Sequence, residues 1–226
     1  MFLISISSWM QQVMIVNKDN NRIINNHSHR DAYKFLLKPV IDWLIAFMAL
    51  ITLSPLFIVV ALAIILDTKG PVFFMQERLG RYGKVFRIFK FRSMVVNKSA
   101  NTENKLYEND PRITRTGRFI RKTSIDELPQ LLNILIGDMS FIGPRPPVPY
   151  FPKKIEEYNE FEYQRFLVKP GISGLAQVRC REIHDWNINI PIDVEYVQNY
   201  SFLYDVKLFI VSVKAFFKSD NIYRKE

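Results

Sequence analysis

The sequence predicts an α+β, membrane-associated protein: an N-terminal re-entrant helix–break–helix hairpin, followed by a small cytoplasmic domain of helices and a short β-hairpin. Three observations support this fold class: an apolar run over residues 40–66, two strand-like runs around a glycine turn, and helical spacing after residue 110. With 226 residues and 48% hydrophobic side chains, the chain can form a core, which excludes an intrinsically disordered protein. No Gly/Pro/Ser-rich linker divides it, so one globular unit with appendages is expected.

The apolar run over residues 40–66 has Asp42 as its only charge. A straight helix of this length extends about 40 Å against a hydrocarbon core of about 30 Å, so a tilted span is the simplest interpretation. Ser54-Pro55 lies at the midpoint, where proline frees the Ile51 carbonyl, which either the Ser54 hydroxyl or water could satisfy. Basic residues flank both ends and tend to stay in the cytoplasm, which favours a re-entrant hairpin over a kinked span.

Two further patterns follow the apolar run. Residues 72–75 and 85–91 predict a β-hairpin whose turn contains Gly80 and Gly83. Residues 97–111 are polar and predict a surface loop, and residues 151–169 and 203–218 have helical spacing. The apolar face of the last stretch is typical either of core packing or of a helix lying in the lipid interface.

Charge and cysteine content narrow the function classes. The chain carries 31 basic and 22 acidic residues, a net charge of +9, which indicates an anionic partner: nucleic acid, a phosphorylated small molecule or an anionic membrane. Cys180 is the single cysteine, which excludes a disulfide framework and a four-cysteine zinc site. Three scattered histidines do not form a His-rich metal cluster.

The candidate chemistry lies in residues 110–147. A leucine repeat at helical spacing predicts a helix from about Asp126 to Gly137, with Pro129 in its first turn. Asp126 and Glu127 would then lie at a helix N-terminus, where the dipole favours acids, and Ser124 has capping-box spacing with Glu127. One interpretation of the acidic pair is therefore purely structural.

Five cations precede this pair, which is more than capping requires: Arg112, Arg115, Arg118, Arg121 and Lys122. A solvated basic face is one interpretation of them. Guanidinium groups also bind phosphate bidentately, so the second interpretation is a phosphorylated ligand beside a carboxylate. There an aspartate can attack phosphorus, and an adjacent glutamate can supply an oxygen ligand to Mg²⁺.

Four ordered motifs resemble those of the bacterial sugar transferases, the monotopic polyprenyl-phosphate phosphoglycosyl transferases: KGPVFFMQERLG, FRIFKFRSM, DPRITRTGRFIRKTSIDELPQLLNILIGDMSFIGPRPP and KPGISGLAQV. The resemblance implies transfer of a sugar 1-phosphate from a UDP-sugar to undecaprenyl phosphate, with release of UMP. In that family the reaction is the first membrane step of exopolysaccharide, capsule, O-antigen or glycoprotein glycan synthesis. It takes place on the cytoplasmic face of the bacterial inner membrane.

The resemblance also implies roles for individual residues. Asp126 would be the nucleophile that forms a covalent aspartyl-phosphosugar intermediate, and Glu127 its catalytic, Mg²⁺-binding neighbour. Substrate-binding roles are implied for Arg121, Arg118, Arg145 of the GPRP motif, Lys90, Arg92 and Asp205. The membrane break at Ser54 and Pro55 is implied as well.

The implied partners are a UDP-sugar, undecaprenyl phosphate and inner-membrane lipids, with Mg²⁺ as cofactor and no nucleic acid; homo-oligomerisation stays open. The expected domains are an N-terminal extension (1–38), a re-entrant membrane helix (39–66) and a cytoplasmic catalytic domain with interfacial helices (67–226). After GLAQV the sequence departs from many relatives, so the sugar is not implied. His184 and Trp186 there are interpreted as loop packing, and Gly171 and Gly174 as backbone requirements.

Two other classes stay open. A catalytically silent scaffold of a glycan assembly complex would keep the fold, but the intact Asp126-Glu127 pair argues against it. A membrane-tethered nucleic-acid binder would explain the positive charge. It leaves the acidic pair unexplained, and the sequence contains no recognisable nucleic-acid-binding motif.

Overall fold

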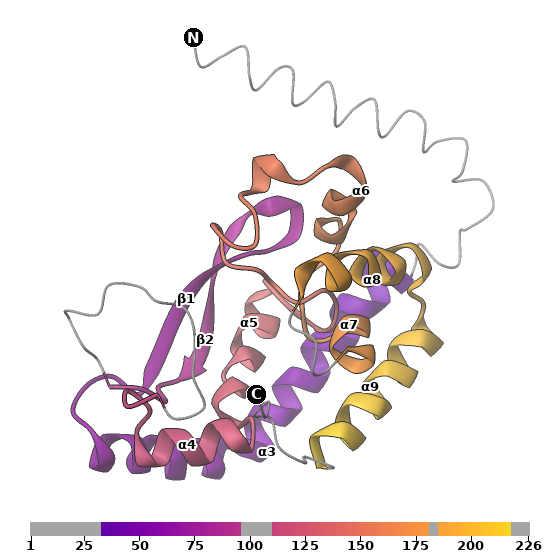
Figure 1. Cartoon of the computed structure of the whole chain (residues 1–226). Helices are drawn as coiled ribbons and strands as arrows, with labels where there is room; N and C mark the ends of the chain where they lie inside the picture. The colour runs from indigo at the N-terminus through magenta and orange to yellow at the C-terminus, as the bar shows by residue number, and fades with distance from the viewer. Residues whose placement is uncertain (1–32, 96–109, 181–184, 218–226) are drawn as a thin grey trace. The chain divides into compact units, whose positions relative to one another are not determined.

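The computed structural model describes residues 33–95, 110–180 and 185–217 (Figure 1). The chain divides into two compact units, Met1–Lys38 and Pro39–Glu226. The described part of the first unit contains a short π-helix, η2 (Tyr33–Leu37). The second combines helices with two two-stranded sheets, so the predicted mixture of helix and sheet is confirmed.

Helix α3 (Lys38–Asp67) contains the predicted apolar segment and continues through Pro55. Ser54 Oγ donates at 2.8 Å to the Ile51 carbonyl, the acceptor that Pro55 leaves free, so of the two partners that the sequence allowed the structure shows the hydroxyl. Figure 1 shows that α3 changes direction: its first part runs beside α5 (Gln130–Ile136) and its last part lies along α4 (Arg115–Lys122). The predicted break is therefore a bend within one continuous helix.

The surface of this helix is strongly apolar. Residues Tyr33–Asp67 make one helical stretch that is long and apolar enough to cross a membrane, with a mean hydropathy of 2.8. Its large side chains are mostly exposed; Met48, Ile58 and Val59 are 60%, 62% and 62% exposed. A core helix of a soluble protein would bury such side chains, so this surface suggests contact with lipid.

The predicted β-hairpin is confirmed. Strands β1 (Phe73–Leu79) and β2 (Val85–Phe91) are antiparallel, with Phe73 opposite Phe91 and Leu79 opposite Val85. Gly83 in the connecting turn has φ +71°, which glycine adopts without strain. The first strand extends beyond the predicted apolar run because a ladder that faces solvent on one side accepts polar side chains.

Strand β2 joins two hydrophobic clusters. One cluster contains Ala46 of α3, Ile88, and Leu131 and Ile134 of α5. The other contains Val60 and Ile64 of α3, Phe91, and Ile120 of α4. Both parts of the bent helix thus pack against one folded unit, and the end of β2 lies between α4 and α5.

Strands β3 (Ser140–Ile142) and β4 (Gly171–Ser173) pair in parallel, and α7 (Leu175–Arg179), α8 (Trp186–Asn199) and α9 (Phe202–Phe217) follow. A Cβ atom on Gly171 or Gly174 would lie 2.2 Å from backbone atoms of Gly143. Both positions therefore require glycine for close backbone approach, as the sequence predicted.

The prediction of one helix over residues 151–169 is wrong. The chain forms three short pieces there, η5 (Ile155–Glu157), α6 (Glu160–Tyr163) and η6 (Gln164–Phe166). Asn159 explains the interruption, because its extended backbone and its side chain, which accepts the Glu162 N–H, start a new helix.

The helix predicted over residues 203–218 is confirmed as α9, and residue 218 lies outside the described residues. Its side chains Val206, Phe209 and Ile210 are 38%, 37% and 47% exposed, whereas Leu208 is buried. Exposure of this apolar face favours the interfacial interpretation over core packing. Most of the predicted loop 97–111 and nearly all of the extension 1–38 lie outside the described residues.

We expect Gly117→Ala to lower the stability of the domain. A Cβ atom there would lie 1.9 Å from the Ser93 carbonyl oxygen, so α4 would have to move away from the end of the hairpin. Such overpacking costs about 1–3 kcal/mol. Thermal unfolding in detergent measures the effect, with Arg118→Ala on the exposed face of the same helix as the control. Equal midpoints for the two variants would contradict the close approach.

Candidate active site

The acidic pair lies in a single 3₁₀ turn, η4 (Ile125–Glu127), between α4 and α5. The predicted α-helix begins only at Gln130, after Pro129, and ends at Gly137 as expected. Pro129 has no N–H to donate to the Ile125 carbonyl, which Leu128 N reaches at 3.1 Å in the tighter i→i+3 pattern. The prediction that Asp126 starts an α-helix is therefore wrong.

The capping-box interpretation is also wrong. Ser124 adopts a left-handed conformation with φ 53°, and its side chain makes no capping hydrogen bond. Glu127 instead accepts a hydrogen bond from Lys90 Nζ at 2.6 Å. Helix capping thus does not account for the two adjacent carboxylates.

Three cations gather around Glu127. Lys90 reaches it from β2, and Arg145 Nη2 lies 3.9 Å from the same Oε1 atom. Arg78 of β1 also acts electrostatically on Glu127. Asn133 holds this arrangement together: it accepts the Phe89 N–H at 3.0 Å and donates to the Arg87 carbonyl at 2.7 Å, tying α5 to β2.

The two carboxylates have opposite electrostatic states. Burial raises the pKa of Asp126 to about 6, and the negative charge of Glu127 adds to the shift, while Lys90 and Arg121 oppose it. Burial also acts to raise the pKa of Glu127. Lys90, Arg145 and Arg78 outweigh burial there and lower that pKa to about 2. Glu127 is thus a fixed anion, and Asp126 is a carboxylate of raised basicity that is still mostly ionised at pH 7.

Arg78 is a site residue that the sequence reasoning did not single out. It donates to the Pro146 carbonyl at 3.0 Å and to Gln76 Oε1 at 2.6 Å. Loss of hydration on burial, and then the charge of Arg145, lower its pKa to about 10, so it stays a cation at neutral pH. The available signal was its place in the motif KGPVFFMQERLG.

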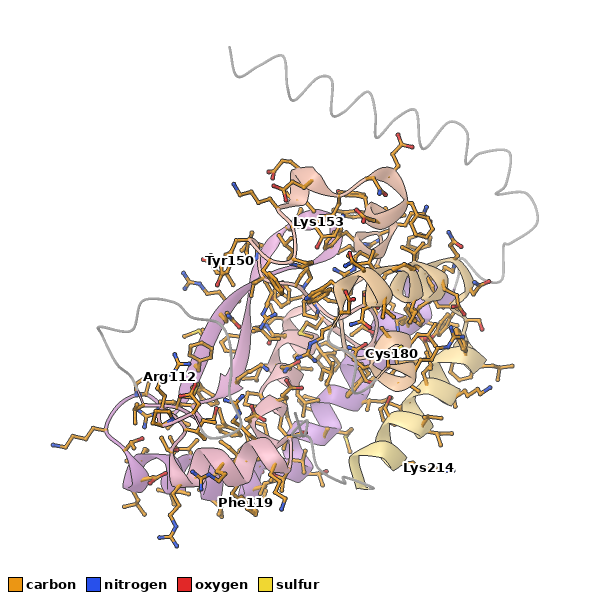
Figure 2. All side chains as sticks on the ribbon, in the orientation of Figure 1. Arg112, Phe119, Tyr150, Lys153, Cys180 and Lys214 are labelled. Carbon is orange, nitrogen blue, oxygen red and sulfur yellow. The ribbon has the colours of Figure 1, made fainter. Side chains whose placement is uncertain are left out.

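Of the other candidate cations and acids among the described residues, only Arg121 is shown to act on the acidic pair. Arg121, at the end of α4, acts electrostatically on Asp126, and Arg118 is exposed on the same helix. Arg112, labelled in Figure 2, forms a local ion pair with Asp110 at 2.6 Å, so its charge is largely committed there. Asp205 is buried in α9, with its carboxylate 2.7 Å from the Tyr196 hydroxyl.

Arg92 has a clear structural role. Its side chain is buried and donates to the carbonyls of Lys69 at 2.7 Å and Thr68 at 2.6 Å, just beyond the C-terminus of α3. A cation at this position stabilises the helix end. A substrate contact for Arg92 stays a prediction.

Trp186 packs with Leu79, Phe166 and Ile190, and its ring lies 5.2 Å from the guanidinium carbon of Arg165. This agrees with the interpretation of Trp186 as a packing residue. His184 lies outside the described residues.

Asp126 and Glu127 offer carboxylate oxygens, the ligand type that Mg²⁺ takes. Among the described residues, no group of three or more His, Cys, Asp or Glu side chains is placed to hold a metal. Mg²⁺ commonly takes only one or two carboxylates and completes its shell with water and substrate phosphates. Two adjacent carboxylates among cations therefore fit a metal that arrives with a phosphorylated ligand.

Comparison with known proteins identifies related chains. The family model for bacterial sugar transferases matches residues 33–219. The UDP-glucose:undecaprenyl-phosphate glucose-1-phosphate transferase of Escherichia coli (strain K12) is 37% identical over 183 residues, covering 79% of this chain and 39% of the relative. The undecaprenyl-phosphate galactose phosphotransferase of Salmonella typhimurium is 38% identical over 217 residues, covering 89% of this chain and 44% of the relative.

The uncharacterized sugar transferase EpsL of Bacillus subtilis is 40% identical over 188 residues, covering 83% of this chain and 90% of the relative. This chain thus spans less than half of the first two relatives and nearly all of the third.

Asn133→Ala should destabilise the site by about 2–4 kcal/mol. The substitution removes two hydrogen bonds, so the Phe89 N–H and the Arg87 carbonyl both lose their bond to the Asn133 side chain. Chemical denaturation of the detergent-solubilised protein measures the loss. Asn133→Asp keeps the acceptor for Phe89 but places a buried carboxylate oxygen against the Arg87 carbonyl, so it should lose at least as much stability as the Ala variant. An Ala variant as stable as the wild type would contradict the anchoring role.

Proposed function

The chain belongs to the bacterial sugar transferase family, and we propose that it transfers a sugar 1-phosphate from a UDP-sugar to undecaprenyl phosphate, releasing UMP. The observation that carries the proposal is the Asp126-Glu127 pair, set against Lys90 and Arg145 inside the matched residues. Two relatives are named for glucose 1-phosphate and galactose phosphate transfer to the same lipid. Their shared reaction class supports the proposal, and their different sugars leave the sugar open.

In the proposed first step, an Asp126 carboxylate oxygen attacks the sugar-bearing phosphorus of the UDP-sugar. The bond from that phosphorus to the bridging oxygen breaks, and UMP leaves with the electron pair. An oxygen of undecaprenyl phosphate then attacks the phosphorus of the aspartyl-phosphosugar, and the bond to Asp126 breaks. One pyrophosphate bond is lost and one is made, so catalysis rests on positioning and charge.

The surrounding residues suit this chemistry. The raised pKa of Asp126 makes it a more basic nucleophile than an ordinary aspartate, while most of it remains ionised at pH 7. Attack by an anion on a phosphate is opposed by charge repulsion, which Arg121, Arg145 and Lys90 would offset. Arg145 is half-exposed, so its guanidinium can reach an incoming nucleotide.

Glu127 would hold Mg²⁺ together with substrate phosphate oxygens and water. When bound, the metal supplies further positive charge to the reacting phosphates. Lys90 keeps Glu127 ionised and fixes its orientation, which prepares the carboxylate for this role.

We further propose that α3 enters and leaves the membrane by the same leaflet. Near its start, Asp42 accepts a hydrogen bond from Ser140 Oγ at 2.6 Å, and at its end Asp67 accepts the Thr116 N–H at 2.8 Å. Both donors belong to one folded unit. A span would place the two ends on opposite sides of the bilayer, where one polar domain cannot contact both.

This topology would place the site at the cytoplasmic face of the bacterial inner membrane. The basic residues on both sides of α3 support that sidedness, because Lys and Arg near membrane segments tend to stay in the cytoplasm. A site at this depth would meet the lipid phosphate and the soluble nucleotide together.

Asp126→Asn is expected to abolish turnover, because the amide is a poor nucleophile and cannot form the acyl phosphate. The measurement is UMP release from a panel of UDP-sugars with undecaprenyl phosphate and Mg²⁺, combined with peptide mass analysis after incubation with donor alone. The wild type should gain the mass of a phosphosugar on the peptide that contains Asp126, and the variant should not.

Asp138→Asn, at a partly exposed aspartate after α5, is the matched control and should keep its activity. Wild-type turnover without any mass gain at Asp126 would refute the covalent mechanism. Unchanged activity in Asp126→Asn would refute the nucleophile assignment.

The membrane topology predicts labelling from one side. In a Cys180→Ser background, Lys38→Cys at the start of α3 and Lys84→Cys in the hairpin turn should both react with an impermeant thiol reagent only from the cytoplasmic side. Inverted and right-side-out vesicles provide the two sides. Labelling of the two positions from opposite sides would show that α3 spans the bilayer.

A further inference from the structure

The proline-rich segment at residues 144–147 is fixed through its backbone carbonyls, each from a different donor. Gly171 N donates to Pro144 O at 3.0 Å, and Leu79 N donates to Pro147 O at 2.9 Å. Arg78 Nη1 donates to Pro146 O at 3.0 Å. Three of the four residues are prolines, which lack an N–H, so the backbone of the segment offers four carbonyl acceptors and only the Arg145 N–H as a donor.

The fourth donor is Arg165, whose Nη2 donates to the Arg145 carbonyl at 2.8 Å. The same nitrogen contacts Asp193 Oδ2 of α8 at 2.6 Å. The side chains of Arg165 and Asp193 are only 0% and 2% exposed. The guanidinium also lies over the rings of Phe166 and Trp186, at 5.3 Å and 5.2 Å from their centres.

This ion pair is poorly suited to a role in stability alone. Nε and Nη1 of Arg165 and Oδ1 of Asp193 are buried without a hydrogen-bond partner among the described residues. Removing two charges from water is costly, and an apolar pair of similar volume is often at least as stable. Buried charges and buried polar atoms without hydrogen bonds are typically found at functional sites.

We infer that Arg165, kept in place by Asp193, is a positioning residue for Arg145 and so sets the affinity of the site for the diphosphate of the nucleotide donor. The contact is to the carbonyl of Arg145 itself, whose own guanidinium lies 3.9 Å from Glu127. Rotation of that peptide would turn the Arg145 side chain away from the acidic pair. The inference rests on the proposed function, because it takes a UDP-sugar as the ligand.

Asp193 has a separate task. Arg165 and Arg145 are like charges near one backbone segment, and an unneutralised Arg165 would repel the second guanidinium. The carboxylate of Asp193 cancels the charge of Arg165 while leaving its donor directed at the Arg145 carbonyl. The positioning contact therefore adds no net charge beside the site that binds phosphate.

The test replaces both partners together, Arg165→Met with Asp193→Leu, so that no unpaired charge is left in the core. The dissociation constant for UDP and the KM for the UDP-sugar are measured in detergent, along with the KM for undecaprenyl phosphate and thermal unfolding. We expect the UDP dissociation constant and the donor KM to rise about tenfold, with the acceptor KM unchanged. A merely structural pair would change the unfolding temperature and leave these constants equal to those of the wild type.

The matched control is Arg179→Met with Glu195→Gln. This ion pair, at 2.7 Å, also joins α8 to a neighbouring element, but it is exposed and does not contact residues 144–147. It should leave all three constants unchanged. If the first double variant does not fold, Arg165→Gln with Asp193→Asn is measured in its place. This amide pair is neutral and polar, but the glutamine side chain is shorter than arginine and cannot reach the Arg145 carbonyl.

Each outcome is distinct. Equal UDP affinity in the wild type and a folded Arg165 double variant would overturn the inference while leaving the proposed function intact. Release of UMP by the wild type together with a selective loss of donor affinity in the double variant would support both. A wild type that neither binds UDP nor releases UMP would overturn the proposed function and this inference with it.

Discussion

The ion pair between Lys90 and Glu127, at 2.6 Å, joins the β-hairpin to the acidic turn. The other parts of the site are arranged around this contact. Because Glu127 pairs with Lys90, its side chain does not take the helix-capping role that the sequence suggested. The ion pair also keeps Glu127 anionic, and that charge, together with burial, raises the pKa of Asp126. One ion pair thus separates two neighbouring carboxylates into a fixed anion and a more basic one, which is the division that a nucleophile and a metal ligand need.

The apolar helix α3 and the acidic site both pack against strand β2. Strand β2 packs with the first part of α3 through Ile88 and with the last part through Phe91. Arg92, the next residue, holds the carbonyls just beyond the end of α3. Lys90, the cation that orients Glu127, belongs to the same strand, so it lies on an element that packs directly against the apolar helix. The apolar helix and the residues of the proposed phosphate chemistry are therefore connected through one strand.

Local patterns predicted several elements well. The hairpin, the end of α5 at Gly137, helix α9 and the bond from Ser54 to Ile51 depend on nearby residues, so the sequence reveals them. The acidic pair and the cations Lys90, Arg121 and Arg145 also came from motifs. The 3₁₀ turn could not be predicted from the leucine repeat, which runs from Leu128 to Leu135 across Pro129 at unbroken helical spacing. The environments of Arg92 and Arg78 depend on partners more than 20 residues distant, which no local pattern contains.

The short distance along the chain from Lys90 to Arg92 has a consequence for how the lipid acceptor of the proposed reaction would reach the site. Two residues of extended chain cover roughly 7 Å, so the reactive carboxylates are held at a nearly constant height above the apolar helix. In the proposed topology, a domain held this way would not move toward the membrane to reach its acceptor. The phosphate head of the proposed lipid acceptor would instead arrive by lateral diffusion within the leaflet that α3 enters.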